Sequence, residues 1–406
     1  MAKLSIKGID FSFMQFEDVL DQISSSTQLD NLNSYLVRVG GKKLYLLIRE
    51  STSFAKIDIK YDSCYSDEEV QKDNYIEGIV VSYTTLFRVI HSYSKETLEN
   101  LLIEINTEDP SYFKIITPTD RISLPHLTLT KEIKEEIYDI IATPFNKSTG
   151  TFQLSLFNDD KMDFIKGVYS SISFIEDEKK NNALALYSDR IVVSNNRHVF
   201  IYHYQNPVIF IDDNNPISLH RKSAKILSIL SKKIDFDTII NGDQSKVAFM
   251  SPGFELVLNN SQANIDPPSK EDLDSLKPTK AINYIDSSIF LDTSLFFNNF
   301  YSSSQEYKAL GINIESNGIR FLLKDSGIVS YNTCNVERFH PYIMGKKLSP
   351  NVDKILVSAM ILNESLLKFL KEVSKGEIIT LYMDGDHKAV YLQTSKREIY
   401  LAKLKE

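Results

Sequence analysis

The chain has 406 residues, of which 42 % are hydrophobic and 25 % are charged, and its formal net charge is −8 at pH 7. A chain of this length can bury two or three hydrophobic cores of ordinary domain size. The acidic balance excludes a protein that coats nucleic acid with its whole surface, but it allows one basic face. No segment is long and apolar enough to cross a bilayer, and residues 1–7 alternate as a strand does rather than resembling a secretory signal. We therefore expect a cytoplasmic protein, in a bacterial cell or in a host cell if the chain is viral.

A helix-like pattern recurs six times, at intervals of roughly 60 to 75 residues. Each copy has apolar residues at helical spacing and is followed by stretches that read as strands. Such a duplicated unit is more typical of a binding or mechanical protein than of an enzyme. The six helix-like segments are 16–25, 83–93, 160–170, 221–232, 293–301 and 364–373.

The first two helix-like segments belong to a first predicted domain. Strand patterns at 43–48, 55–61 and 78–82 precede the second segment, and further strand patterns follow it up to residue 124. Pro125, Pro144 and a polar run at 146–150 then interrupt the pattern. We place this domain at residues 1–143.

Two further domains follow at 144–278 and 279–406. The second opens with a strand pattern at 151–156 and ends in a stretch rich in Pro, Ser, Asp and Lys at 264–280, which we interpret as a linker. The third ends in alternating strands at 389–393 and 398–402. The sequence therefore predicts an α+β protein of three similar domains, each with two helices packed on antiparallel sheets.

Four of the six helix-like segments are basic in an acidic chain. The first segment is an exception, with Glu17, Asp18 and Asp21, and the fifth has almost no charge. On a single helix such cations form an ordinary solvated face, but their recurrence favours a shared positive surface suited to a phosphate backbone. The residues predicted to face DNA are Arg88, Lys95, Lys161, Lys166, Arg221, Lys222, Lys225, Lys232, Lys368 and Lys371.

The order of elements in the second domain resembles a known family. Residues 217–227 match an entry strand and helix, 247–250 and 254–258 a strand pair, and 265–267 an exit that contains proline. Residues 191–199 resemble the strand and turn that carry a Thr-Asp-Gly-His-Arg-Leu signature. Here Asn196, which can adopt positive φ, replaces the glycine, and the His-Arg order is reversed at Arg197 and His198. On these residues the chain resembles the bacterial-type DNA sliding clamp, the beta subunit of DNA polymerase III.

The resemblance extends through the third domain and so spans the chain. Residues 355–370 resemble the strand that leads into the family's last helix, and 398–405 resemble its C-terminal strand and tail. Family tails usually carry Met-Pro-Met where this chain has Ala402, Lys403 and Leu404, so we expect a partner groove that differs in detail. The divergence and the composition suggest a bacteriophage origin.

The resemblance implies a ring of two subunits, each of three domains, whose helices line a hole around duplex DNA. Such a processivity factor needs only weak contact with phosphates, because a closed ring cannot leave the duplex without opening. The implied partners are double-stranded DNA without sequence preference, the replicative polymerase, the clamp loader and a second copy of the chain; no membrane, cofactor, metal or catalytic residue is implied. Partners of the family dock short peptides between the second and third domains. Carried over to this chain, the groove comprises Ser194, Arg197, His198, Val199, Pro267, Ala402, Leu404 and Lys405.

Other classes of protein remain open at this point. A duplicated structural or assembly protein, or an adaptor with a clamp-like fold that does not encircle DNA, would share the repeats. An enzyme is disfavoured because the chain has no HExxH, P-loop, GxGxxG or GxSxG motif. The acidic clusters at 159–160, 212–213 and 384–386 are interpreted as turns, and Cys64 and Cys334 as ordinary thiols.

Overall fold

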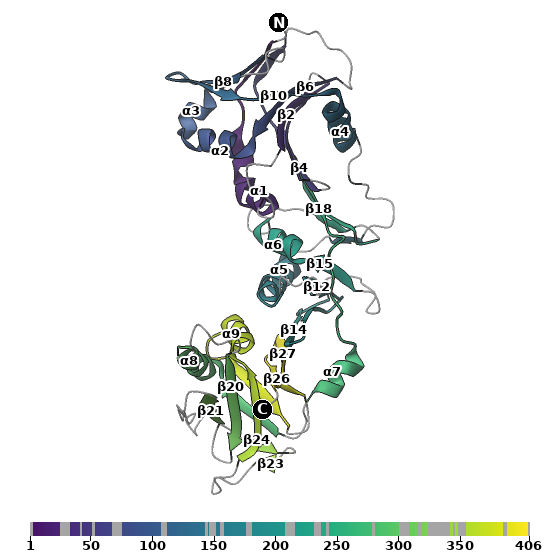
Figure 1. Cartoon of the computed structure of the whole chain (residues 1–406), viewed down its shortest axis with the longest axis vertical. Helices are drawn as coiled ribbons and strands as arrows, with labels where there is room; N and C mark the ends of the chain where they lie inside the picture. The colour runs from purple at the N-terminus through teal and green to yellow at the C-terminus, as the bar shows by residue number, and fades with distance from the viewer. Residues whose placement is uncertain are drawn as a thin grey trace. The chain divides into compact units, whose positions relative to one another are not determined.

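A computed structural model of the chain (Figure 1) shows an α+β protein whose sheets are antiparallel. The described residues form two compact units, Met1–Ser155 with Lys225–Gln262, and Leu156–Ala224 with Ala263–Glu406. Lys232, Cys334 and Lys405 lie outside the described residues, and the three-domain division at 143 and 278 stays a prediction. The structure describes residues 3–24, 33–40, 43–50, 53–66, 75–106, 112–142, 145, 152–154, 158–175, 181–207, 216–230, 237–240, 243–277, 281–299, 308–315, 319–323, 342–343, 346–347, 355–384 and 388–404.

The first unit is built on two antiparallel sheets. One has the strand order β5 (Ser63–Ser66), β1 (Lys3–Lys7), β7 (Leu102–Asn106), β8 (Tyr112–Ile116) and β9 (Arg121–Pro125). The other has the order β10 (Leu127–Thr128), β6 (Ile76–Ser82), β2 (Asn33–Val39), β3 (Lys43–Glu50), β4 (Ser53–Ile59), β18 (Phe254–Asn259), β17 (Lys246–Ser251), β16 (Asp237–Ile240) and β11 (Phe152–Leu154). Phe254 lies opposite Ile57, so the larger sheet pairs strands that are far apart in sequence.

One helix of the first unit begins where a strand ends. Helix α2 (Tyr83–His91) follows β6 directly, and the Ser82 hydroxyl caps it by accepting the amide of Thr85. Its buried face includes Leu86, Phe87 and Ile90. The other helices of this unit are the 3₁₀ helix η1 (Phe11–Phe16), α1 (Glu17–Ser24), α3 (Lys95–Glu99) and α4 (Lys131–Ala142).

The second unit contains a ten-stranded sheet and a three-stranded sheet. The larger sheet has the order β15 (Ile217–His220), β12 (Ala183–Leu186), β13 (Arg190–Ser194), β14 (His198–His203), β27 (Arg397–Ala402), β26 (Ala389–Gln393), β25 (Ile378–Met383), β19 (Ala281–Asp286), β22 (Tyr342–Ile343) and β23 (Lys346–Lys347). The smaller has the order β21 (Ile319–Leu323), β20 (Ala309–Glu315) and β24 (Ile355–Leu362). Strand β14 pairs with β27, and we call this pairing the seam. It joins two strands that are far apart in the sequence of the unit.

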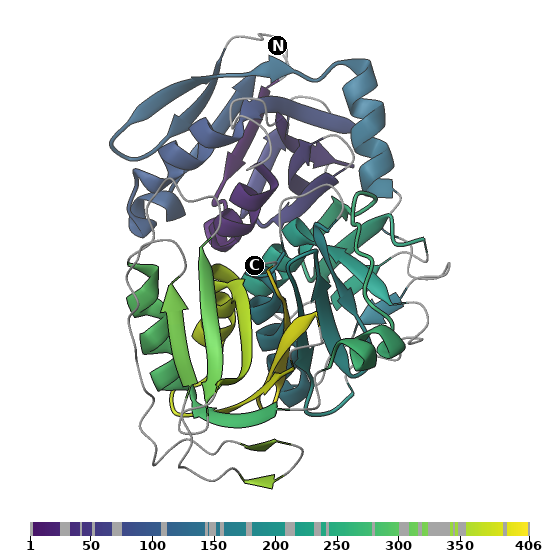
Figure 2. The same cartoon turned by 60° about the horizontal axis from the view of Figure 1, so that its bottom comes forward.

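Helices α5 (Asn158–Ile172), α7 (Lys270–Leu276), α8 (Ser287–Asn298) and α9 (Asn363–Glu372) belong to the second unit, and α6 (Arg221–Leu230) crosses the sequence boundary at Ala224. Helices α8 and α9 lie side by side in both views (Figures 1 and 2). Helix α5 approaches β14 closely because Gly167 has no side chain: a Cβ there would lie 2.6 Å from Cδ1 of Tyr202.

Within the described residues, each of the six helix-like segments of the sequence contains a helix, and the α+β class is confirmed. The fifth begins at Ser287 rather than near residue 293, since Asp286 caps it by accepting the amide of Ser288. The interpretation of 159–160 as a turn was wrong, because both residues lie in the first turn of α5. Among the described helices, none combines the length and hydrophobicity needed to span a membrane.

Candidate nucleic-acid interface and peptide groove

The cations predicted on the second helix divide between two helices. Arg88 is exposed in the last turn of α2, whereas Lys95 begins α3, a separate short helix that Ser94 caps. His91, also in the last turn of α2, lies 2.6 Å from a carboxylate oxygen of Glu17 in α1. The acidic first helix therefore faces the basic end of the second.

Helix α5 presents its cations away from the sheet and a carboxylate toward it. Lys166 is exposed and Lys161 is half-buried. Asp163 accepts hydrogen bonds from the Tyr202 hydroxyl at 2.9 Å and from Lys396 at 2.7 Å. Burial opposes ionisation of Asp163, but these bonds and the amide of Gln205 hold the pKa of its carboxyl below the usual value. The carboxylate thus links α5 to strand β14 and to the turn that precedes β27, on the two sides of the seam.

Helix α6 carries three of the predicted cations in its first half. Arg221 and Lys222 are half-buried, and Lys225 is exposed. The helix starts directly after β15, where the Lys222 amide donates to Nδ1 of His220 at 3.2 Å. Its apolar face is buried, with Ile226 fully inaccessible to solvent.

Helix α9 carries one paired cation and one exposed cation. Lys368 lies 3.1 Å from Glu364, one turn earlier, so part of its charge is neutralised. Lys371 is exposed in the last turn. The apolar face of α9 buries Leu366, Phe369 and Leu370.

In the second unit, the chain after α5 and the start of α9 meet on one face of the ten-stranded sheet. Phe174, which follows α5, stacks on Phe200 of β14 with ring centroids 4.1 Å apart. Phe200 also contacts Phe369 of α9 edge to face at 6.5 Å. Lys166 and Lys371 therefore come from two helices that cover the same side of the seam.

His198 lies on this helix-covered face. Its Nδ1 is 3.0 Å from the Ser365 hydroxyl in α9, and its Nε2 is 3.2 Å from the Phe174 carbonyl. Burial lowers the pKa of His198 to about 4, so the imidazole is neutral at physiological pH. The side chain joins β14 to α9, and its predicted place in the groove stays untested.

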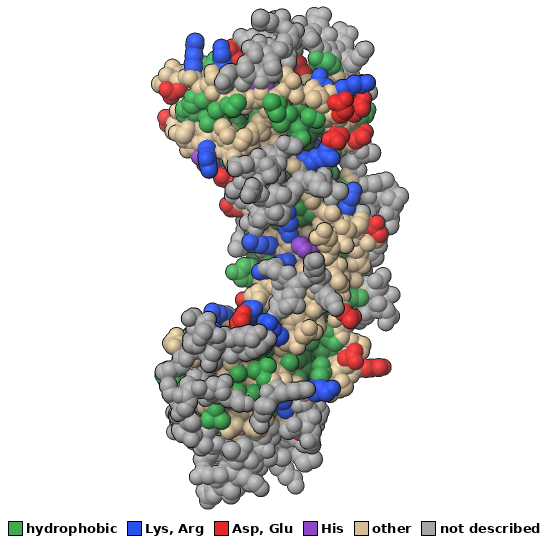
Figure 3. Space-filling model, in the orientation of Figure 1, with side chains coloured by type: hydrophobic (Ala, Val, Ile, Leu, Met, Phe, Trp, Pro, Cys, Tyr) green, Lys and Arg blue, Asp and Glu red, His purple; other side chains and the backbone are tan. Residues whose placement is uncertain are grey.

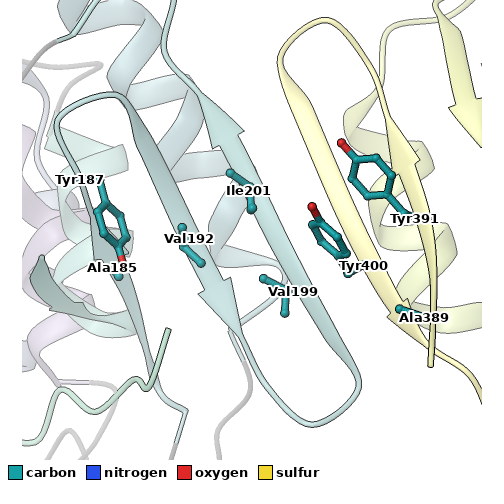
Figure 4. Packing of buried hydrophobic residues seen from close by; sticks show 8 residues of the cluster. All are labelled: Ala185, Tyr187, Val192, Val199, Ile201, Ala389, Tyr391 and Tyr400. Atoms are coloured by element: carbon teal, nitrogen blue, oxygen red, sulfur yellow. The ribbon is translucent and has the colours of Figure 1, made fainter. Parts of the chain in front are cut away.

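Successive residues of a strand point to opposite faces, so Val199 lies on the other face of the sheet. It packs in a cluster that spans both sides of the seam (Figure 4). We call this cluster, with Tyr382 at its margin, the tyrosine strip. It consists of Ala185, Tyr187, Val192, Val199, Ile201, Tyr382, Ala389, Tyr391 and Tyr400.

The turn before β14 forms without a left-handed residue at Asn196, because Gln244 is the sole non-glycine residue with positive φ in the described part of the chain. The side-chain oxygen of Asn195 instead accepts the amides of Arg197 and His198, at 2.8 and 2.9 Å. Arg197 is exposed, and Ser194 is half-buried at the end of β13. Asn196 therefore does not replace the signature glycine through a positive φ, and the hydrogen bonds to the Asn195 side chain shape the turn instead.

The C-terminal tail is held by backbone hydrogen bonds on both sides. The Ala402 amide donates to the carbonyl of Arg197 at 2.9 Å, and the Leu404 amide donates to that of Met360 at 2.8 Å. Ala402, Leu404 and Pro267 are each half-buried. The structure thus brings the tail and the Arg197 turn together.

Sequence reasoning missed the tyrosines beside Val199. Tyr391 and Tyr400 lie opposite each other on β26 and β27, with ring centroids 4.6 Å apart, and Tyr382 lies 4.9 Å from Tyr391. The alternating pattern of the last two predicted strands assigned Tyr391 and Tyr400 each to a definite face of its strand. It could not show which of the two faces other parts of the chain would cover.

The whole chain matches solved structures of bacterial DNA polymerase III beta subunits. The DNA polymerase III subunit beta from Pseudomonas aeruginosa superposes with a TM-score of 0.68 at 11 % identity, covering 100 % of both chains. The chain has the fold of the bacterial DNA sliding clamp. Caulobacter crescentus pol III beta matches this clamp fold with a TM-score of 0.65 at 12 % identity, again over 100 % of both chains. The Bartonella birtlesii DnaN sliding clamp, bound to griselimycin, gives the same TM-score, identity and coverage.

No protein-family model and no curated protein matches the sequence of this clamp-fold chain. The matched structures named above are bacterial proteins. A bacteriophage origin therefore stays an untested prediction.

Proposed function

We propose that this protein is a DNA polymerase sliding clamp, a non-enzymatic processivity factor that encircles duplex DNA as a homodimer and tethers the replicative polymerase. The observation that carries the proposal is the clamp fold over the full chain length. The proposed partners are double-stranded DNA, the polymerase, the clamp loader and a second copy of the chain, in the cytoplasm.

The placement of charge supports contact with DNA. In the second unit, Lys166 and Lys371 come from helices on one side of the seam, where they can meet phosphates without reading bases. The remaining predicted DNA-facing cations are proposed for the same role. Contact of this kind is weak and independent of sequence, as sliding requires.

Two exposed apolar side chains support self-association. Helix α8 carries no Lys or Arg, and it leaves Leu295 39 % and Phe296 43 % exposed while Phe290 and Phe297 pack against Phe321. Neighbouring large apolar residues on a helix surface mark a site that association removes from water.

The deciding experiment compares circular with linear DNA. After loading, a clamp stays on a nicked circle and slides off a linear duplex of equal length and sequence, because only topology retains it. Equal retention on both would show ordinary binding, and no retention on either, with a monomer in solution, would favour an adaptor that does not encircle DNA. Negative-stain images of the purified protein should show closed rings.

The groove is tested separately. Changing Leu404 to Asp should abolish peptide-mediated binding of the polymerase and leave the ring intact, since the tail lies beside the Arg197 turn. A matched change at exposed Lys388 should leave polymerase binding unaltered.

A further inference from the structure

A pocket of about 400 Å³ lies beside α4 in the first unit, and we call it the α4 pocket. One wall is formed by Tyr75 and Ile76, where β6 begins. The other wall is a stripe along α4 whose members are three and four residues apart, so that they share one side of the helix. The stripe consists of Lys131, Lys134, Glu135, Tyr138 and Asp139. The volume is within the range of ligand-binding sites, about 300–1,000 Å³.

The α4 wall is fixed by contacts that leave the stripe unused. Ile133, Ile137 and Ile140, on a different side of the helix, pack α4 on the larger sheet. Glu136 forms an ion pair with Arg49 of β3. The pocket is therefore present before anything binds, and binding does not have to order α4.

Two tyrosines make the α4 pocket suited to an aromatic ring. Tyr138 is 37 % exposed, although Ile137 next to it is buried. On the other wall, Tyr75 is half-buried and Ile76 is buried. A ring inserted between these walls would leave water and would contact the tyrosine rings, as aromatic pairs in proteins do.

Charges of both signs lie along the stripe. Lys131 and Lys134 come first, and Glu135 and Asp139 follow them toward the end of α4. Lys131 and Glu135 are 3.8 Å apart, at the limit of an ion pair, and Lys134 makes no ion pair within the described residues. Figure 3 shows acidic side chains gathered over α4, with basic side chains beside them. This balance disfavours a polyanion such as nucleic acid and favours a ligand that carries one charge of each sign.

The length of the stripe fits a short extended peptide. Lys131 and Asp139 are about 12 Å apart along the axis of α4, because each residue of a helix rises about 1.5 Å. In an extended chain every second side chain points to the same face, and the outer two of three such side chains are about 13 Å apart. Such a chain can place an acid beside the lysines, an aromatic ring between the tyrosines and a base beside the carboxylates.

We propose that the α4 pocket is a docking site for an extended segment of a partner protein, in which an aromatic residue has an acidic residue two positions away on one side and a basic residue two positions away on the other. The inference does not rest on the proposed function, and it adds a partner surface in the first unit.

The test uses tryptophan fluorescence, because the chain itself contains no tryptophan. The probe is the acetylated and amidated peptide Asp-Ser-Trp-Ser-Lys, titrated with the full chain. A matched peptide, Ser-Asp-Trp-Lys-Ser, has the same composition, but in an extended chain it turns both charges away from the face of the ring. We expect saturable binding of the probe, and binding at least about fivefold weaker for the matched peptide and for free tryptophan.

Variants locate the binding. Tyr138→Ala should weaken probe binding about tenfold, since it removes a ring that the indole contacts, whereas Tyr65→Ala, at a more exposed tyrosine of β5, should leave it unaltered. Lys134→Glu should weaken probe binding several-fold. A probe with Lys in place of its Asp should then bind Lys134→Glu more tightly than it binds the wild type, because the pair of opposite charges is restored in reverse.

The inference is overturned by the absence of saturable probe binding, by equal affinity for the probe and the matched peptide or free tryptophan, or by equal effects of Tyr138→Ala and Tyr65→Ala. The probe with reversed charge keeps the result decisive if a variant is destabilised, since an unfolded protein cannot lose affinity for one probe and gain it for the other. Retention on circular DNA plays no part in this test, so failure of the clamp assignment leaves its result unaffected.

Discussion

Ser294 donates its hydroxyl to the side-chain oxygen of Asn363 at 2.5 Å, and Asn363 returns its amide to the Ser294 carbonyl at 3.1 Å. Both residues are fully buried, so this pair joins α8 to α9 where no water can replace either partner. The two helices of the third predicted domain are therefore joined to each other by buried polar groups.

Changing Asn363 to Ala should lower the free energy of unfolding by about 1–3 kcal/mol, because two buried polar atoms lose their partners. Urea denaturation followed by circular dichroism measures the loss, and Asp292→Asn, at an exposed position of α8, is the control. The double change with Ser294→Ala should cost less than the sum of the single changes. Strict additivity would contradict the pairing.

His198 should make the protein less stable in mild acid. Its pKa is about 4 in the folded state and near 6.5 when unfolded, so the unfolded chain binds the proton first as pH falls. The stabilising effect is fully present above about pH 6.5 and disappears between there and pH 4. Between pH 7 and pH 5 the free energy of unfolding should fall by about 2 kcal/mol from this residue alone.

The variant His198→Gln separates the contribution of His198 to the pH dependence of stability from the contributions of other titrating groups. It should be less stable than the wild type at pH 7, yet it should lose less stability on going to pH 5. An identical pH profile for wild type and His198→Gln would refute the buried, neutral imidazole.

Reversing the charge of Lys371 should shorten retention on circular DNA without unfolding the protein, because an exposed cation on the helix-covered side of the sheet is lost. The slope of log affinity against log salt should fall by about 0.9 for each phosphate contact removed. Lys270→Glu, on α7 at the opposite face, makes the same change in net charge and should leave retention unaltered. Equal effects of both variants would point to net charge rather than to a DNA-facing helix.

Replacing Leu295 and Phe296 with Asp should weaken self-association at least about tenfold, since a loss of about 1.4 kcal/mol suffices for that change. Sedimentation velocity across a concentration series measures it. Asn299→Asp, just beyond the same helix, is the charge control. A dimer of unchanged affinity would remove α8 from the interface.

Strong periodicity explains which elements could be predicted from the sequence. Six helices were found because each repeats its apolar residues at helical spacing, but α4 was missed although Ile133, Ile137 and Ile140 have the same spacing. Helix α4 lies outside the repeat of six helix-like segments, so the spacing of those segments does not predict it. Helix α7 was missed because its Pro-, Ser- and Asp-rich surroundings are typical of a linker; the capping box of Ser269 and Asp272 was the available signal.

The candidate groove shows a different limit. Arg197, Val199 and the tail come together around the seam, yet His198 points to the other face because adjacent residues of a strand cannot share one. Adjacent residues of a strand lie on opposite faces, so reversing the His-Arg order of the motif exchanges the faces to which the two side chains point. Val199 lies opposite Tyr400 because β14 pairs with β27, a contact that local sequence does not encode.

The seam also sets the order in which the protein can mature on the ribosome. Strand β14 ends at His203, whereas its partner β27 follows much later in the chain, at Arg397–Ala402. Until β27 has been synthesised, β14 lacks this strand partner, and its apolar edge can pair with another nascent chain. A chain that terminates before β27 keeps that edge unpaired, so premature termination at this point should yield aggregates rather than a slightly shortened protein.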